Sequence, residues 1–381
     1  MYLKVLSSRL SLLDRLLAPL ILLCMIVGVL IGVFVNGVQE AFNTVEFHGV
    51  SVPIAIGLIV MMWPTLTNVR YECLGRTLLS RKLWIHLSIS LVLNWIIGPL
   101  VMLGLAWATM PDLPTYRTGV IMVGIARCIA MVMIWNGLAG GDTEYCAIIV
   151  VVNSVLQMAL YSPYAVLFVD IGGAKQGQEV HLQYGTVAVS VLIYLGIPLL
   201  AGVVTRLTVL HISPNFFHHT FLPCFSTVSL LGLLYTILVL FAYQGHHIVH
   251  NIGNVARVAV PLILYSVLMW IGTAALLWTF SRRGTLQKCS RGDRMNETER
   301  IFNYEMAVVQ AFTAASNNFE LAIAVTIATY GVGSDQALAA TIGTLVEVPV
   351  LLSLTWVAQA AKVRLPWDCV EICSDDRVEK A

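Results

Sequence analysis

The chain has 381 residues, of which 58% are hydrophobic and only 11% are charged, and its formal net charge is +1. Soluble domains carry about 25% charged residues, so this composition excludes an ordinary soluble domain and gives no sign of nucleic-acid binding. The hydrophobic runs are unbroken over about 20 residues, the length of a helix that crosses a bilayer, and they lack the alternation of barrel strands. The sequence therefore predicts an all-α integral membrane protein.

Ten hydrophobic segments follow one another along the chain, each long enough to span a bilayer. Their connections are short, except for the polar stretch 281–304 between the eighth and ninth segments. We expect ten transmembrane helices, at roughly 16–38, 50–69, 83–109, 118–139, 145–169, 182–204, 221–243, 255–280, 305–330 and 336–360.

The distribution of lysine and arginine predicts the orientation of these helices, because basic residues gather in cytoplasmic loops. With the N-terminus in the cytoplasm, the segments on the cytoplasmic side hold 18 basic residues, and those outside hold three: Arg117, Lys175 and Arg257. Both termini are therefore predicted to be cytoplasmic. Arg127 is the one basic residue placed deep inside a predicted span, whereas Arg257 lies at the external end of the eighth.

Ten helices with this topology divide into two sets of five, and the second set enters the membrane from the opposite face. An odd number of helices in each half is what an inverted repeat requires, and inverted repeats are common among transporters. In both halves a polar residue in a span, a Gly-Asp-type turn and a second polar residue recur at similar spacings, as Cys128, Asp142, Asn153 and as Glu320, Asp335, Glu347. We expect a first five-helix repeat over residues 1–170 and a second over 171–381, with a cytoplasmic loop at 281–304 and a cytoplasmic C-terminal tail.

Two of the segments contain polar runs that a lipid-facing helix does not tolerate. Residues 124–142, GIARCIAMVMIWNGLAGGD, place Arg127 beside Cys128 in the fourth span and end in a glycine pair. Residues 314–320, AASNNFE, place three consecutive polar side chains in the ninth span. Asn and Ser often cap helix ends, and interrupted spans at matching positions of two halves point to a binding site at the bilayer midplane. We therefore predict that the fourth and ninth helices are broken and face each other.

Three ionisable side chains lie deep inside predicted spans: Arg127, Glu320 and Glu347. A charge at this depth costs about 2.5–3.5 kcal/mol on insertion scales, so such residues are candidates for function. Each also has a structural interpretation. A long side chain can reach the interface, and Glu347, two residues before Pro349, can cap a break in its helix.

Cys128 adds a thiol to this group. Cysteine sulfur binds soft, thiophilic centres, whereas carboxylates suit protons and hard cations. Cysteine is also a common small core residue, which is how we interpret Cys24, Cys146 and Cys224. The residues alone leave a functional and a packing role equally open for Cys128.

Other polar groups carry weaker signals. His246, His247 and His250 fall in a predicted external loop, where two of them at i and i+4 could share a metal. Cys369 and Cys373 in the polar tail are interpreted as free thiols, with soft-metal binding or palmitoylation as alternatives. The sequence contains no nucleotide-binding loop, zinc-protease helix or hydrolase elbow, so we expect an ion gradient to supply the energy and we expect no cofactor.

The polar segments also carry a resemblance to a known family. GIARCIAMVMIWNGLAGGDTEY, NSVLQMALYSPYAVLF, AASNNFELAIAV and GTLVEVPVLLSL closely resemble the arsenite efflux permeases of the arsenical-resistance type, in the bile acid/arsenite/riboflavin transporter superfamily. The similarity covers nearly the whole chain, including LSLLDRLLAPL at the start and LLYTILVLFAYQG in the seventh span. The clearest departures are HHTFLPCFS and the basic loop 281–304, which put regulation in doubt but not transport.

This resemblance implies a ten-helix inverted-repeat fold with crossed, broken fourth and ninth helices, and export of arsenite, sometimes antimonite, against proton entry. It makes Cys128 the essential thiol that binds arsenite as a metalloid, and Glu320 the essential carboxylate, with Glu347 as a second proton-coupling residue. It places the other substrate-binding positions at Arg127, Trp135, Asn153, Ser316 and Asn318. No organelle signal is visible, so we expect the plasma membrane rather than a vacuolar membrane, and no obligate protein partner is evident.

Two other classes of protein stay open on the residues alone. A sodium-coupled importer of organic anions would hold a carboxylate with Arg127 and helix N-termini, and sodium with Glu320 and Asn317; dependence on sodium rather than on a pH gradient would identify it. An intramembrane enzyme would need a base beside Cys128, and the nearest histidine by depth, His86, sits near a helix start. The sequence therefore predicts a transporter and not an enzyme.

Overall fold

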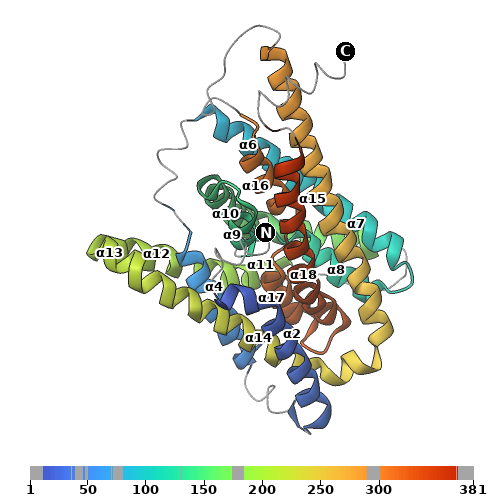
Figure 1. Cartoon of the computed structure of the whole chain (residues 1–381). Helices are drawn as coiled ribbons and strands as arrows, with labels where there is room; N and C mark the ends of the chain where they lie inside the picture. The colour runs from blue at the N-terminus through green and yellow to red at the C-terminus, as the bar shows by residue number, and fades with distance from the viewer. Residues whose placement is uncertain are drawn as a thin grey trace.

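The described elements of the computed structural model are helices (Figure 1), apart from one antiparallel pair of two-residue strands. The structure describes residues 12–35, 37–38, 46–47, 50–69, 71, 80–129, 131–173, 184–289, 301–365 and 367. In chain order the elements are α2 (Leu12–Phe34), β1 (Glu46–Phe47), β2 (Val50–Ser51), α4 (Val52–Thr67), α6 (Arg81–Val92), the π-helical turn η2 (Leu93–Ile97), α7 (Gly98–Thr109), α8 (Pro114–Ile125), α9 (Met131–Ala139), α10 (Thr143–Gly173), α11 (Tyr184–Val191), η3 (Leu192–Gly196), α12 (Ile197–Ile212), α13 (Pro214–Phe216), η4 (Phe217–Phe221), α14 (Leu222–His250), α15 (Ile252–Cys289), α16 (Tyr304–Ala315), α17 (Phe319–Tyr330) and α18 (Asp335–Arg364).

Long apolar helices make this a multi-pass membrane protein. Six helical stretches of the described chain are long and apolar enough to cross a membrane: Arg81–Thr109, Thr143–Val169, Tyr184–Ile212, Pro214–His250, Ile252–Arg283 and Asp335–Arg364. Shorter apolar helices lie at Pro19–Phe34 and Val52–Thr67, where the first two spans were predicted.

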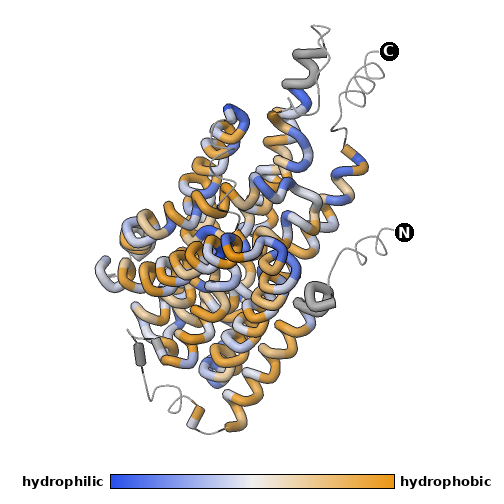
Figure 2. Tube along the Cα trace, turned by 90° about the vertical axis from the view of Figure 1, so that its left-hand side faces the viewer, coloured by the Kyte–Doolittle hydropathy of each residue, from blue (hydrophilic) through white to orange (hydrophobic). Residues whose placement is uncertain are grey.

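Hydrophobic side chains cover the outside of the helices as well as filling the core. Leu200, Leu231 and Leu167 are 68%, 60% and 53% exposed, respectively. Hydrophobic residues also run along most of the helical tube in Figure 2. Exposed apolar surface on this scale is unusual for a soluble monomer and is what helices present to lipid, where only backbone groups satisfied within the helix are stable.

The fourth and ninth predicted spans are each broken, as the polar runs predicted. α8 ends at Ile125 and α9 begins at Met131, whereas α16 ends at Ala315 and α17 begins at Phe319. In the middle of a membrane an irregular backbone is stable only where protein buries it. The described residues of both breaks are buried, and they lie among other helices.

The helices pack as two groups. α14 lies along α2 and α4, and α12 packs on α4. These four helices, which occupy the lower part of Figure 1 from α12 at the left to α2 at the bottom, are called the flank group. Gly32 of α2 meets Gly245 of α14 so closely that a Cβ on Gly32 would lie 3.0 Å from the Cα of Gly245. Small residues permit such close crossings in membranes. The other helices that pack on one another, α7 to α10 and α15 to α18, are called the core group.

Two predictions about helix ends are wrong, and one of the two interpretations of Glu347 is excluded. α14 continues to His250, so the histidines after the seventh span are helical and do not form a loop. α15 continues to Cys289 and takes in the first part of the predicted loop 281–304. α18 runs unbroken past Pro349, so Glu347 does not cap a break. A membrane helix tolerates proline because its neighbours satisfy the freed carbonyl, and the sequence pattern does not show those neighbours.

Candidate functional site

The two broken helices cross where their extended segments pair. Arg127 and Asn317 form an isolated antiparallel bridge, and the N–H of Asn318 donates to the carbonyl of Ala126 at 3.2 Å. Each segment thereby satisfies backbone groups of the other, which a buried break requires. The crossing joins parts of the chain that lie 190 residues apart in sequence.

Two helix N-termini lie beside the crossing. Asn318 caps α17, because its Oδ1 accepts a hydrogen bond from the N–H of Leu321 at 3.1 Å. At the start of α9, the backbone N–H groups of Met131 and Val132 interact with the thiol of Cys128. A helix N-terminus carries partial positive charge and unpaired N–H donors. The crossing therefore offers hydrogen-bond donors to ligands that carry oxygen or sulfur.

Arg127 is fully buried and links the fourth span to several other segments. Its Nη1 donates to the hydroxyl of Tyr265 at 2.8 Å, and its Nη2 donates to Asn317 Oδ1 at 2.9 Å and to the carbonyl of Gly124. Its backbone N–H donates to Gln157 Oε1. The ion pairs of the described chain do not include Arg127. The guanidinium is thus held by neutral groups at the crossing, and its role in substrate binding stays a prediction.

Cys128 and the two predicted proton-coupling residues form one cluster. Cys128 lies in the first break, is 3% exposed and interacts electrostatically with Glu320 and Glu347. Glu347 of α18, 5% exposed, interacts in turn with Glu320 and with the backbone N–H of Asn317. A thiol and two carboxyl groups from three separate segments are therefore within electrostatic reach of one another.

A cleft of about 450 Å³ reaches this cluster between the flank group and the core group. Glu320 lines it, together with Ile129 in the first break and Met131 at the start of α9. Most of the remaining walls come from the C-terminal half of α4 and the N-terminal half of α14, the ends that are predicted to face the cytoplasm. Their lining residues include Thr65, Asn68, Ser226, Thr227 and Ser229.

The other predicted binding residues divide between the crossing and the helices behind it. Ser316 and Asn318 are buried in the second break itself. Trp135 and Asn153 are buried farther along α9 and α10, and Asn153 Oδ1 accepts a hydrogen bond from the indole of Trp95 at 3.1 Å. The structure therefore places Ser316 and Asn318 nearer the breaks than the other two.

Unpaired polar atoms are concentrated on these residues. Six buried side-chain nitrogen and oxygen atoms of the eight predicted site residues have no hydrogen-bond partner in the described chain. Burying an unpaired polar group costs free energy, so proteins rarely leave them without a reason. The concentration fits a site that binds a polar ligand, and its atoms are Arg127 Nε, Trp135 Nε1, Asn153 Nδ2, Ser316 Oγ, Asn318 Nδ2 and Glu347 Oε1.

Sequence reasoning missed two residues that hold the crossing together. Gln157 follows Asn153 by four residues and so shares its helix face; a second amide in an apolar span was the signal that could have found it. Tyr265 gave no such signal, because a single tyrosine in the eighth span is unremarkable in sequence. His86, the candidate base for an enzyme, instead has its Nε2 2.7 Å from the carbonyl of Ile301.

Three further cysteines of the described chain lie in other surroundings. Cys146 is buried in α10, Cys24 is partly buried in α2 and Cys224 is exposed near the start of α14. Cys369 and Cys373 lie outside the described residues. Among the described residues, no group of three His, Cys, Asp or Glu side chains is arranged to hold a metal ion. The cluster at the crossing thus offers one thiol, that of Cys128.

Replacing Arg127 by leucine is expected to destabilise the fold. The change leaves the buried oxygens of Tyr265 and Asn317 without the donor that Arg127 supplies, and hydrogen bonds to charged groups contribute about 1.5–3 kcal/mol each. The melting temperature of the detergent-solubilised protein should fall clearly, whereas replacing the exposed Arg257 should change it little. An unchanged melting temperature for Arg127→Leu would show that these bonds do not hold the crossing.

Comparisons with known proteins agree with this architecture. Residues 55–251 match the model of the Sodium Bile acid symporter family. The chain is 40% identical over 353 residues to the arsenical-resistance protein Acr3 of Corynebacterium glutamicum, which covers 92% of this chain and 89% of that protein. It is 28% identical over 364 residues to Acr3 of Alkaliphilus metalliredigens, with 93% and 94% covered, and 30% identical over 382 residues to an uncharacterized transporter of Synechocystis, with 95% and 92% covered.

The matches to the three relatives extend over most of the chain, and the family model covers about half of it. The families they indicate consist of membrane transporters and not of enzymes. The chain therefore belongs to the sodium bile acid symporter family and, within it, to the Acr3-type permeases.

Proposed function

We propose that this protein exports arsenite from the cytoplasm in exchange for protons, and that antimonite is a second substrate. The observation that carries the proposal is the cluster at the helix crossing, where one buried thiol interacts with two carboxyl groups. Identity to two proteins named for arsenical resistance supports the choice of substrate. The plasma membrane is the proposed location.

A single sulfur suits the transport of arsenite. At neutral pH arsenite is mostly an uncharged trihydroxide with a thiophilic arsenic centre, and Cys128 supplies the soft ligand that such a centre prefers. One thiol engages the arsenic reversibly, whereas three would trap it, and a conducting site must also release what it binds. The unpaired atoms of Ser316 and Asn318 are suited to hydrogen-bond the arsenic hydroxyls.

Glu320 is the proposed proton carrier, with Glu347 as the second coupling residue. Glu320 lines the cleft and lies within electrostatic reach of Cys128. A proton on Glu320 and arsenite on Cys128 would therefore occupy neighbouring positions at the same crossing. Competition between them is what antiport requires: arsenite binding from the cytoplasm displaces the proton, and a proton taken up outside displaces arsenite.

The proposal includes two inverted five-helix repeats, over residues 1–170 and 171–381. Each half contains one broken span, and each break is followed by a glycine with positive φ, Gly140 at 76° and Gly331 at 88°. The next helix then begins at a polar cap, with Asp142 before α10 and Ser334 before α18. Matching elements in this order support a common ancestor of the two halves. Together with the distribution of basic residues, they support ten spans with both termini in the cytoplasm.

Arsenite uptake into everted membrane vesicles tests the proposed function. Everted vesicles expose the cytoplasmic face, so an acidic interior should drive accumulation of arsenite, and collapse of the pH gradient should abolish it. Vesicles without the protein are the control. Uptake that follows a sodium gradient and ignores the pH gradient would contradict proton coupling and favour the sodium-coupled alternative.

A further inference from the structure

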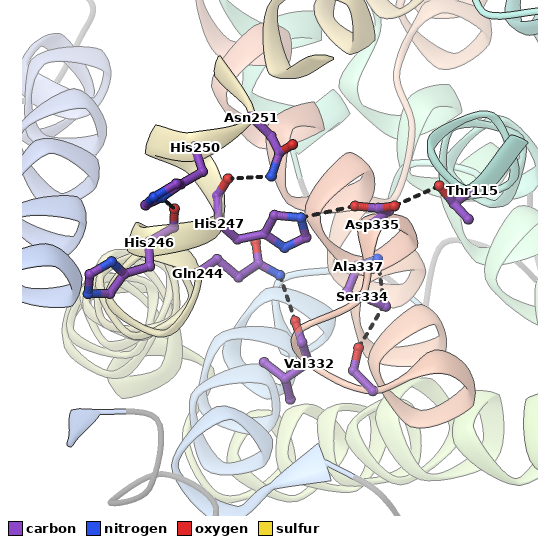
Figure 3. Close-up of polar contacts among 11 residues, drawn as sticks. Thr115, Gln244, His246, His247, His250, Asn251, Val332, Ser334, Asp335 and Ala337 are labelled. Carbon is purple, nitrogen blue, oxygen red and sulfur yellow. Dashed lines mark hydrogen bonds and ion pairs between the residues drawn. The ribbon is translucent and has the colours of Figure 1, made fainter. Parts of the chain in front are cut away.

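The end of α14 that lies farthest from the cleft is tied to the core group (Figure 3). His247 Nε2 lies 3.0 Å from Asp335 Oδ1, and Gln244 Nε2 donates to the carbonyl of Val332 at 2.9 Å. Both contacts connect the flank group to the core group. Leu233 is the last residue of α14 that lines the cleft. His247 lies roughly 21 Å farther along the axis of the same helix.

Asp335 is held in place by other residues of the core group. Thr115 of α8 donates to Asp335 Oδ2 at 2.7 Å, on the carboxylate oxygen that His247 does not contact. Asp335 also lies in the first turn of α18, which Ser334 caps by accepting from the N–H of Ala337. A carboxylate is favoured at that position by the helix dipole. The core group thus presents a fixed carboxylate, and α14 brings the histidine to it.

The ion pair between His247 and Asp335 is exposed enough to water to open. The side chains of His247 and Asp335 are 24% and 31% exposed, so water can replace each partner on separation. Ion pairs at such positions contribute little to stability. A weak contact between two helix groups is suited to form and break in every cycle, whereas a deeply buried pair would lock them together.

We propose that His247, Asp335 and Thr115 form an outer latch, which closes the external side of the pathway while the cleft is open to the cytoplasm. The inference rests on the proposed function, because only a transporter needs its two sides closed in turn. Such proteins move one group of helices against another around a fixed midplane site. Opening the outer side must separate α14 from the start of α18, and closing the cleft must bring the other end of α14 toward α9.

A second ion pair at the same end of the molecule provides a matched control. Arg257 of α15 donates to Asp112, in the turn after α7, at 2.7 Å, so both partners belong to the core group. The guanidinium holds the pKa of Asp112 at about 2, below its ordinary value of 3.8. The contribution of this pair is therefore present above the ordinary value and lost only as the pH falls through about 2. Removing it deletes an external ion pair without releasing the flank group.

Accessibility of the cleft tests the latch without any transport measurement. Thr227 lines the cleft. In a background in which the other cysteines on the predicted cytoplasmic side, Cys73, Cys224, Cys289, Cys369 and Cys373, are replaced by serine, Thr227→Cys reports how often the cleft is open to a membrane-impermeant maleimide added to everted vesicles. Asp335→Ala is expected to slow this labelling about two- to fivefold, the population shift that loss of a weak ion pair produces. His247→Ala should act in the same direction and leaves the cap of α18 intact. Asp112→Ala should leave the rate unchanged.

Restoring the pair in reverse separates the latch from a general effect on folding. The double variant His247→Asp with Asp335→His should recover the labelling rate of the parent. Equal labelling in His247→Ala, Asp335→Ala and the parent would overturn the proposal. Equal slowing in Asp112→Ala, or no recovery in the reversed pair, would overturn it as well. If labelling responds as expected while vesicles take up no arsenite, the latch stands and the proposed substrate falls.

Discussion

Replacing Cys128 by serine should reduce arsenite export more than tenfold while the protein still reaches the membrane. Serine keeps the size of the side chain nearly constant but removes the soft ligand. Loss of a group that only supports a ligand already costs about 10- to 100-fold in affinity, so loss of the ligand itself should cost at least as much. Export is measured as arsenite retained by cells, with the membrane content of the variant measured in parallel.

Cys146 provides the matched control, because it is also a buried thiol but lies away from the crossing, in α10. Cys146→Ser should leave most of the export intact, and so should replacement of Cys24, Cys224, Cys369 or Cys373. Full arsenite resistance in cells that carry Cys128→Ser would show that the thiol does not bind the substrate.

Replacing Glu320 by glutamine should abolish the response of arsenite transport to a pH gradient. Glutamine keeps the shape of the side chain and its hydrogen bonding, but it cannot release a proton. Glu320 lines the cleft and lies within electrostatic reach of Cys128, so a fixed neutral group there removes the competition on which exchange depends. The measurement is uptake into everted vesicles at several imposed pH gradients.

Glu347→Gln is the comparison for this experiment. Its amide can still accept from the N–H of Asn317, which interacts with the Glu347 carboxyl in the native protein, so we expect a milder loss. If Glu320→Gln responds to the gradient like the parent and Glu347→Gln does not, then the proton is carried by Glu347.

The sequence predicted the breaks well because they depend on local chemistry. AASNN cannot continue a lipid-facing helix, and asparagine there caps the next one, as Asn318 does for α17. Gly140, after the fourth span, likewise has a positive φ, which residues other than glycine rarely adopt. The cluster of Cys128, Glu320 and Glu347 was predictable for a similar reason. Titratable groups deep in a span cost free energy, so a protein that keeps them there usually uses them.

The partners of Arg127 were not predictable, because they come from segments far away in sequence. Tyr265 lies 138 residues from Arg127 and Asn317 lies 190 residues away, and no periodicity in one span reports what another brings to it. The histidines at the end of α14 were placed in a loop for the same reason. Polarity alone suggested solvent, whereas His247 meets Asp335 of α18, whose place depends on how the two groups of helices pack.

Proton movement in proteoliposomes during arsenite uptake tests the central claim, exchange of arsenite for protons, most directly. The purified protein is reconstituted into liposomes that contain a pH-sensitive dye, without an imposed pH gradient, and arsenite is added outside. The account predicts that arsenite entering through protein with its cytoplasmic face outward makes the lumen more alkaline, and that Cys128→Ser and Glu320→Gln abolish the signal. Arsenite accumulation with no change in luminal pH, or accumulation that requires sodium, would contradict it.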